Sequence, residues 1–88
     1  MSDRAPTREV RDVLAAIIGG GAASSVDEND LLFEGGIIDS LHLIELIDLL
    51  QERFGMEVES DELSPENFES LQAMADYVRR KRGSQHLA

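Results

Sequence analysis

Apolar residues recur with helical spacing in three separate stretches of the chain. The first stretch covers residues 7–18, after Pro6 and before a run of three glycines at 19–21. Thr7 is placed to cap the helix, the proline keeps it from starting earlier, and the glycines end it. Four residues follow the i, i+3, i+4, i+7 spacing of one helical face: Val10, Val13, Leu14 and Ile17.

The second periodic stretch predicts a helix over residues 40–54, closed by Gly55. Five of its residues lie within about 100° of arc and predict a core-facing stripe. These residues are Leu43, Leu46, Ile47, Leu50 and Phe54.

The last periodic stretch predicts a helix that begins near Ser70, with its core stripe at Leu71, Met74, Ala75 and Val78. Before it, the sequence SPENF is typical of a single helical turn, in which Ser64 is the cap and Pro65 the first helical residue. Residues 56–63 are expected to be a short polar connection.

Residues 19–39 form a long connection without helical periodicity. A loop of this length inside a small domain is often functional. Its three consecutive apolar residues, Leu31, Leu32 and Phe33, are expected to hold it against the core.

These elements predict an all-α fold, a small four-helix bundle of three main helices and one short helix with a long first loop. The chain of 88 residues is long enough for one small domain, over residues 1–88. We expect its ordered core to span about residues 7–82 and the tail at 83–88 to be frayed.

The formal net charge of −10 disfavours nucleic acid and anionic membranes as partners and favours proteins with basic patches. The absence of cysteine excludes disulfides, zinc–thiolate sites and a cysteine nucleophile. No secretory signal and no apolar run of about 20 residues is present. We therefore expect a soluble, cytoplasmic protein that is monomeric.

Ser40 stands at the start of the second predicted helix, in the sequence GIIDSL. One interpretation is structural, because Asp39 is a common type of N-cap residue and Ser40 would then be only the first helical residue. The other interpretation is chemical, because the N-terminus of a helix favours a bound phosphate group.

A second face of the same helix, beside the core stripe, carries two large aliphatic side chains among carboxylates. Helical geometry places Leu41 and Ile44 there, and three acids frame them: Glu45, Asp48 and Glu52. A surface helix normally keeps such a face polar. This combination predicts a docking surface for a partner that carries basic residues around a shallow apolar pocket.

The sequence offers Ser40 no general base of its own. His42 lies about 200° around the helix, and the residues around Ser40 do not match a G-x-S-x-G elbow. We expect no catalytic residue in this chain, so any reaction of Ser40 requires another enzyme.

Two further charged segments indicate no additional site. The acidic stretch that starts at Asp27 fails the EF-hand pattern, since Leu32 and Ile38 occupy the positions of the glycine and the glutamate. We predict no metal site. The basic residues at 79–82 suit the C-terminal end of a helix dipole.

The residues GIIDSLHLIELIDLLQERFG resemble the acyl carrier proteins and peptidyl carrier domains, whose hallmark is Asp-Ser-Leu or Asp-Ser-Met at the start of the second helix. The resemblance covers residues 8–82 and includes the long first loop and the ENFESLQAMADYV segment. GIIDSL together with SPENFESL is most similar to stand-alone carriers of the D-alanyl and aminoacyl type.

The resemblance implies that Ser40 receives 4'-phosphopantetheine from coenzyme A through a magnesium-dependent phosphopantetheinyl transferase. It implies that Asp39 helps the transferase to engage, and that Leu41, Ile44, Glu45 and Asp48 contact partner enzymes. The arm would carry an acyl or aminoacyl group as a thioester. An adenylating ligase would load it, and an acyltransferase or condensing enzyme would unload it.

Two residues depart from the pattern of the carriers of fatty-acid synthesis. His42 stands where an acidic residue is typical, and Asp48 stands where an apolar residue is frequent. These departures argue against general fatty-acid synthesis and leave the carrier role unchanged. The alternative from another class is an unmodified acidic helical adaptor, in which Ser40 only begins a helix.

Overall fold

The structure, a computed structural model, describes the backbone of residues 6–86 and the side chains of residues 6–82. Within this part of the chain the regular elements are all helical, as predicted. They are α1 (Thr7–Ile18), α2 (Gly20–Ser25), α3 (Ser40–Phe54), the 3-10 helix η1 (Ser60–Glu62), α4 (Pro65–Phe68) and α5 (Leu71–His86). None of the described helices is long and apolar enough to cross a membrane.

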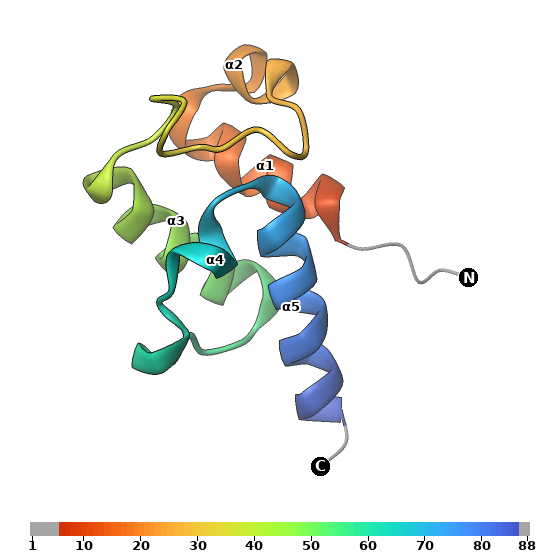
Figure 1. Ribbon diagram of the computed structural model, residues 1–88. Helices are drawn as coiled ribbons and strands as arrows, with labels where there is room; N and C mark the ends of the chain where they lie inside the picture. The colour runs from red at the N-terminus through yellow and green to blue at the C-terminus, as the bar shows by residue number, and fades with distance from the viewer. Residues whose placement is uncertain (1–5, 87–88) are drawn as a thin grey trace.

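Helix α1 packs against both α3 and α5, and α4 lies on α5 (Figure 1). The predicted stripes face this core: Leu46 and Leu50 of α3 are fully buried, as are Leu71 and Met74 of α5. Burial of such apolar surface is the main driving force for folding. The core stripes are therefore confirmed at these positions, whereas Ile17, Leu43, Ile47 and Phe54 are half-buried and pack against the edge of the core.

The N-cap of α1 is Pro6, and the prediction that Thr7 caps this helix is wrong. The backbone N–H of Val10 donates to the Pro6 carbonyl at 3.0 Å, so the helical hydrogen bonding already includes that carbonyl. Thr7 is accordingly the first helical residue. At the other end of the chain, α5 continues to His86, past the expected start of the tail, and residues 87–88 lie outside the described part.

Helix α2 lies inside the segment that the sequence predicts as an irregular loop, which corrects that prediction. Gly19, at φ +99°, separates it from α1. The Arg11 guanidinium donates to the carbonyls of Ala23 at 2.7 Å and Val26 at 2.5 Å, which satisfies acceptors at the end of α2. Tertiary hydrogen bonds thus stabilise a helix that its two leading glycines disfavour.

The long segment before α3 is held at Leu32, which is fully buried, as expected from its apolar character. The Leu32 N–H donates to the Glu69 carbonyl at 2.8 Å, and the Leu32 carbonyl accepts from the N–H groups of Ile37 at 2.8 Å and Ile38 at 3.1 Å. Phe33 is half-buried and Leu31 is exposed. These contacts fix the direction in which the chain enters α3.

Gly55 closes α3 in the left-handed conformation, at φ +60°, as the sequence predicts. We expect Gly55→Ala to lower the free energy of unfolding by about 1 kcal/mol, because an L residue is strained there. A Cβ at Gly55 meets no atom within 4 Å, so this cost arises from the backbone alone. Urea denaturation measures it.

Gly21→Ala is the matched control for this substitution. Gly21 lies within α2 without a positive φ, and its Cβ position is also open. We expect a neutral or slightly stabilising effect there, since alanine favours the helix. Equal losses at Gly21 and Gly55 would contradict the assignment of the left-handed cap.

Candidate functional site

Ser40 is the first residue of α3, and its side chain is exposed. No side-chain hydrogen bond found among the described residues uses its hydroxyl, whereas Ser64 and Ser70 use theirs to accept from the N–H groups of Glu66 and Ala73. The Ser40 hydroxyl is therefore accessible to an external reagent at the positive end of a 15-residue helix.

Asp39 caps α3, as the structural interpretation of the sequence has it. Its Oδ1 accepts from the His42 N–H at 3.0 Å, and the His42 Nδ1 accepts from the Asp39 N–H at 3.4 Å. The two residues thus form a reciprocal capping box. The sequence interpretation placed His42 away from Ser40 and missed this role. The three-residue spacing from the cap is the signal that could have revealed it.

The backbone N–H of His42 holds the pKa of the Asp39 carboxyl below its ordinary value of 3.8, with the His42 ring contributing less. A carboxyl whose pKa is lowered by folding adds stability above its ordinary pKa. That stability is lost as the pH falls through the lower, folded pKa. Asp39 therefore favours the folded state at neutral pH and loses this effect in acid.

We expect Asp39→Asn to melt below the wild type near pH 6, because the amide oxygen accepts a hydrogen bond but carries no charge at the helix N-terminus. The difference in melting temperature should shrink as the pH falls toward about 3. Thermal denaturation followed by circular dichroism measures it. Asp48→Asn, at an exposed position of the same helix, is the control, and an equal pH trend there would contradict the role of the cap.

Leu41 and Ile44 remain exposed, at 68% and 60% of their surface, which agrees with the predicted second face. The acids that frame them, Glu45, Asp48 and Glu52, are also exposed. The ion pairs of the described residues use none of these three carboxylates.

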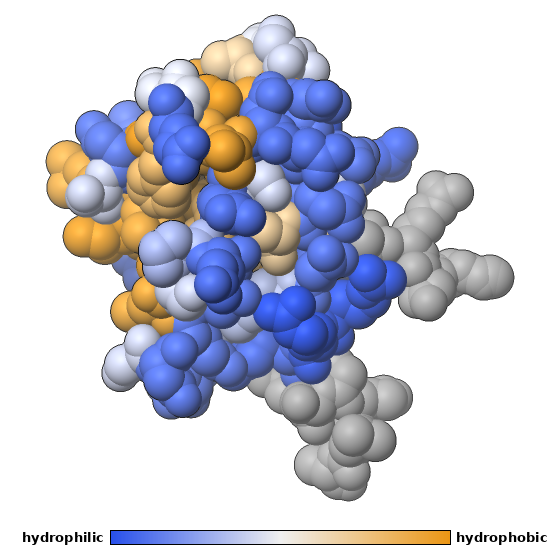
Figure 2. All heavy atoms as spheres, viewed as in Figure 1, coloured by the Kyte–Doolittle hydropathy of each residue, from blue (hydrophilic) through white to orange (hydrophobic). Residues whose placement is uncertain are grey.

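Figure 2 shows apolar surface gathered on the side of the molecule where α3 lies, whereas the surface over α5 is mostly hydrophilic. Glu52 stands at the far end of the second face, where it also borders a groove with Asp12 and Arg53. The carboxylates of this face are thus available to basic groups of another protein.

An apolar cavity of about 340 Å³ lies beside the start of α3. The lining consists of Phe33, Leu43, Leu63, Ser64, Pro65 and Phe68. Leu43, expected in the core, is half-buried and lies one turn below Ser40, so it connects the cavity to the attachment end of the helix. The sequence did not reveal this cavity, because its walls come from segments that are distant along the chain.

The basic residues at 79–82 precede the last turn of α5, which continues to His86, so the expectation that they lie at the C-terminal end of the helix is wrong. They have partners within the protein. Arg79 pairs with Asp76 at 2.9 Å, Arg80 donates to Asn67 at 3.0 Å, and the Arg82 guanidinium lies 5.6 Å from the ring centre of Phe54. These contacts, rather than the helix dipole, account for the basic side chains of this segment. Among the described residues, no cluster of three metal-binding side chains is present.

Comparison with known proteins gives a family and similar proteins. A family model described as the phosphopantetheine attachment site matches residues 8–78. The probable acyl carrier protein PigG of Serratia sp. (strain ATCC 39006) is 32% identical over 60 residues, which cover 68% of this chain and 69% of that protein. The solution structure of a holo acyl carrier protein from Nitrosomonas europaea matches with a TM-score of 0.79 and 28% identity, over 91% of this chain and 99% of that chain.

Proposed function

The chain belongs to the family of acyl carrier proteins with a phosphopantetheine attachment site, and we propose that Ser40 is the residue that carries the group. The prosthetic group of this family is 4'-phosphopantetheine. When bound, it supplies a terminal thiol that can hold an acyl group as a thioester. The chain has no cysteine, so a thioester function requires this imported thiol.

The surroundings of Ser40 fit the attachment of a phosphate group. Its hydroxyl is exposed and lies at the first turn of α3, where backbone N–H groups point out of the helix. A negative phosphodiester at this end of the helix is stabilised by the dipole. This geometry is the observation that supports the proposal most strongly.

In the attachment reaction, the Ser40 oxygen forms a bond to the phosphorus of coenzyme A that bears the pantetheine. The hydroxyl proton passes to a base of the transferase, and adenosine 3',5'-bisphosphate leaves. The contacts of the His42 Nδ1 with Asp39 support a base supplied by the transferase rather than by His42. This agrees with a chain that is a substrate of the transferase and a non-catalytic carrier.

The second face of α3 is the proposed contact surface for partner enzymes. Leu41 and Ile44 would enter a shallow apolar pocket, while Glu45, Asp48 and Glu52 would meet basic residues around it. The partners are the transferase, an adenylating ligase that loads the arm, and an acyltransferase or condensing enzyme that unloads it. The absence of ion pairs from these carboxylates to other described residues supports this assignment.

The apolar cavity beside α3 indicates which kind of cargo the arm carries. Its lining includes no charged side chain. Transfer of an apolar acyl group from water into this cavity would be favourable, whereas the ammonium group of an aminoacyl cargo would be desolvated there without a counter-ion. The cavity therefore favours an uncharged acyl cargo over the D-alanyl and aminoacyl cargo that the sequence resemblance implies.

The intact mass of the protein tests the proposed function. The protein is incubated with coenzyme A, Mg²⁺ and a broad-specificity phosphopantetheinyl transferase, beside a known carrier as control. We expect a gain of one phosphopantetheine. An unchanged mass, with the folded protein and a modified control carrier, would instead support the acidic adaptor, in which Ser40 only begins α3.

A further inference from the structure

The carboxylate of Glu62, at the end of η1, accepts hydrogen bonds from three groups. It accepts from the Glu59 N–H at 2.9 Å, from the Tyr77 hydroxyl at 2.9 Å, and from the Lys81 ammonium at 2.9 and 3.2 Å. The Glu59 N–H, followed by Lys81, keeps the pKa of Glu62 below its ordinary value. Burial, together with Glu62, raises the pKa of Tyr77, so this hydroxyl remains a donor.

Two further contacts join residues 60–68 to α5. Arg80 of α5 donates to the Asn67 side-chain oxygen at 3.0 Å, and the Asn67 side-chain N–H donates to the Glu62 carbonyl at 2.9 Å within the segment. The rings of Phe68 and Tyr77 lie with their centres 5.4 Å apart, tilted by 59°. Residues 60–68 are thus attached to α5 through both polar and aromatic groups.

This attached segment is also one wall of the apolar cavity. Leu63, Ser64, Pro65 and Phe68 line one side, and Phe33 and Leu43 line the other. Tyr77 therefore contacts two parts of the wall, Glu62 through its hydroxyl and Phe68 through its ring. The position of the wall determines how wide the cavity is.

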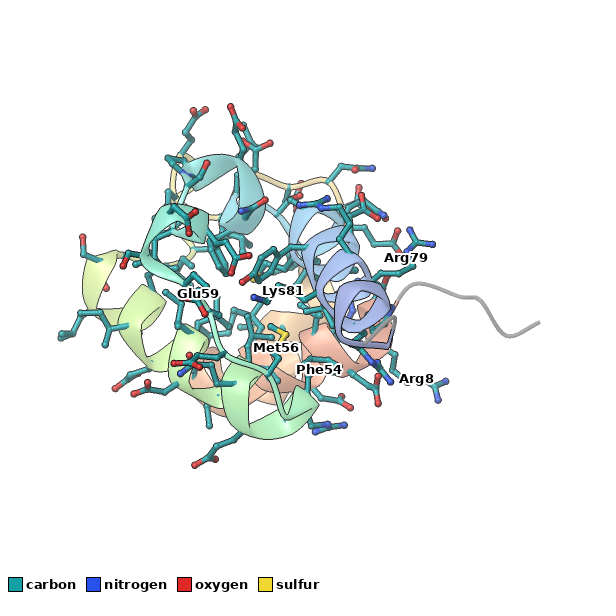
Figure 3. All side chains as sticks on the ribbon, turned by 90° about the horizontal axis from the view of Figure 1, so that it is seen from below. Arg8, Phe54, Met56, Glu59, Arg79 and Lys81 are labelled. Atoms are coloured by element: carbon teal, nitrogen blue, oxygen red, sulfur yellow. The ribbon has the colours of Figure 1, made fainter. Side chains whose placement is uncertain are left out.

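Apolar packing anchors this wall at Phe68, which is buried in the core, but gives little support at its other end. Leu63 is 51% exposed, and α4 contains only four residues. The Lys81 and Glu62 side chains, by contrast, are only 17% and 28% exposed. Figure 3 shows Lys81 pointing from α5 into the molecule, toward the segment that carries Glu59, whereas Arg79 points away. Removing either partner of such a pair leaves a partly buried charge without its counter-ion.

We propose that Tyr77 and Lys81 are positioning residues that, through Glu62, hold residues 60–68 as the cavity wall and so limit the size of the acyl group that the cavity accepts. The cargo part of this inference rests on the proposed carrier function. The contacts that position the wall are already present in the unmodified chain. The position of the wall and the carrier function can therefore be tested separately.

Two neutral fluorescent probes test the wall on unmodified protein, the smaller N-phenyl-1-naphthylamine and the larger Nile red. We expect wild type to bind the smaller probe more tightly. In Tyr77→Phe and Lys81→Met, the ratio of the two dissociation constants should shift by about fivefold toward the larger probe, which is the effect of one hydrogen bond. Tyr77→Phe keeps the ring contact, and Glu62→Gln provides a further variant should Lys81→Met fail to fold.

Three controls separate wall position from general stability. Arg79→Met removes an exposed ion pair of the same helix. Val10→Ala lowers stability by truncating a buried side chain of α1. Both should keep the wild-type ratio, and Lys81→Arg should largely restore it because the charge is retained.

An unshifted ratio in Tyr77→Phe and Lys81→Met would overturn the proposal. An equal shift in Val10→Ala at the same loss of melting temperature would do so too, as would a wild-type protein that binds neither probe. These outcomes are independent of the mass test. An unchanged mass would contradict the carrier function but not the role of Tyr77 and Lys81 at the cavity wall. An unshifted ratio would contradict that role but not the carrier function.

Discussion

Ser40→Ala is expected to gain no mass under the conditions that convert the wild type to its phosphopantetheine form. The substitution removes the only atom that can form the phosphodiester at this position. We expect complete loss of modification, and with it complete loss of any acyl loading. Intact-mass spectrometry of both proteins after parallel incubation measures this result.

The fold should be almost unchanged by the same substitution. Ser40 is exposed and the cap of α3 is Asp39, so the free energy of unfolding should change by no more than about 0.5 kcal/mol. Ser64→Ala is the matched control, because Ser64 does cap a helix. It should lose about 1 kcal/mol and still gain the full mass. Modification of Ser40→Ala would disprove the assigned position.

Reversing two charges on the second face of α3 should have the next largest effect. We expect Glu45→Lys with Asp48→Lys to slow modification by the transferase about 10- to 100-fold, which corresponds to about 1.4–2.8 kcal/mol. Like charges brought together at an interface are costly, and charge changes at its rim act mainly on the association rate. The initial rate of mass gain at low salt measures the effect.

Glu28→Lys with Glu57→Lys changes the net charge by the same amount at exposed positions outside α3. This control should retain most of the wild-type rate, because only the long-range attraction is weakened. Added salt should reduce the difference between the wild type and the α3 variant. Equal losses in both double variants would show that net charge, rather than this face, determines recognition.

The boundaries of α3 could be predicted because their signals are local. Asp39 at the cap and Gly55 in the left-handed position are adjacent to the helix they delimit. Helical geometry alone also separated buried Leu46 and Leu50 from exposed Leu41 and Ile44. The functional roles of Ser40 and of the second face remain proposals that the structure accommodates.

Features that depend on distant contacts could not be predicted. Helix α2 forms where Arg11 reaches carbonyls 12 and 15 residues away, against the helix propensity of its glycines. The wall of the cavity depends on Glu62 meeting Lys81, 19 residues later in the chain. Neither pairing has a periodic signal, because many acidic and basic residues of this chain could have been partners.

Fragmentation mass spectrometry of the modified protein tests the carrier function at Ser40 most directly. After incubation with coenzyme A, Mg²⁺ and the transferase, the protein is cleaved and the peptide that contains GIIDSL is sequenced by fragmentation. The proposed function predicts one phosphopantetheine on Ser40 and none on the serines elsewhere. A group on another residue, or an unmodified peptide from a folded protein beside a modified control carrier, would contradict it.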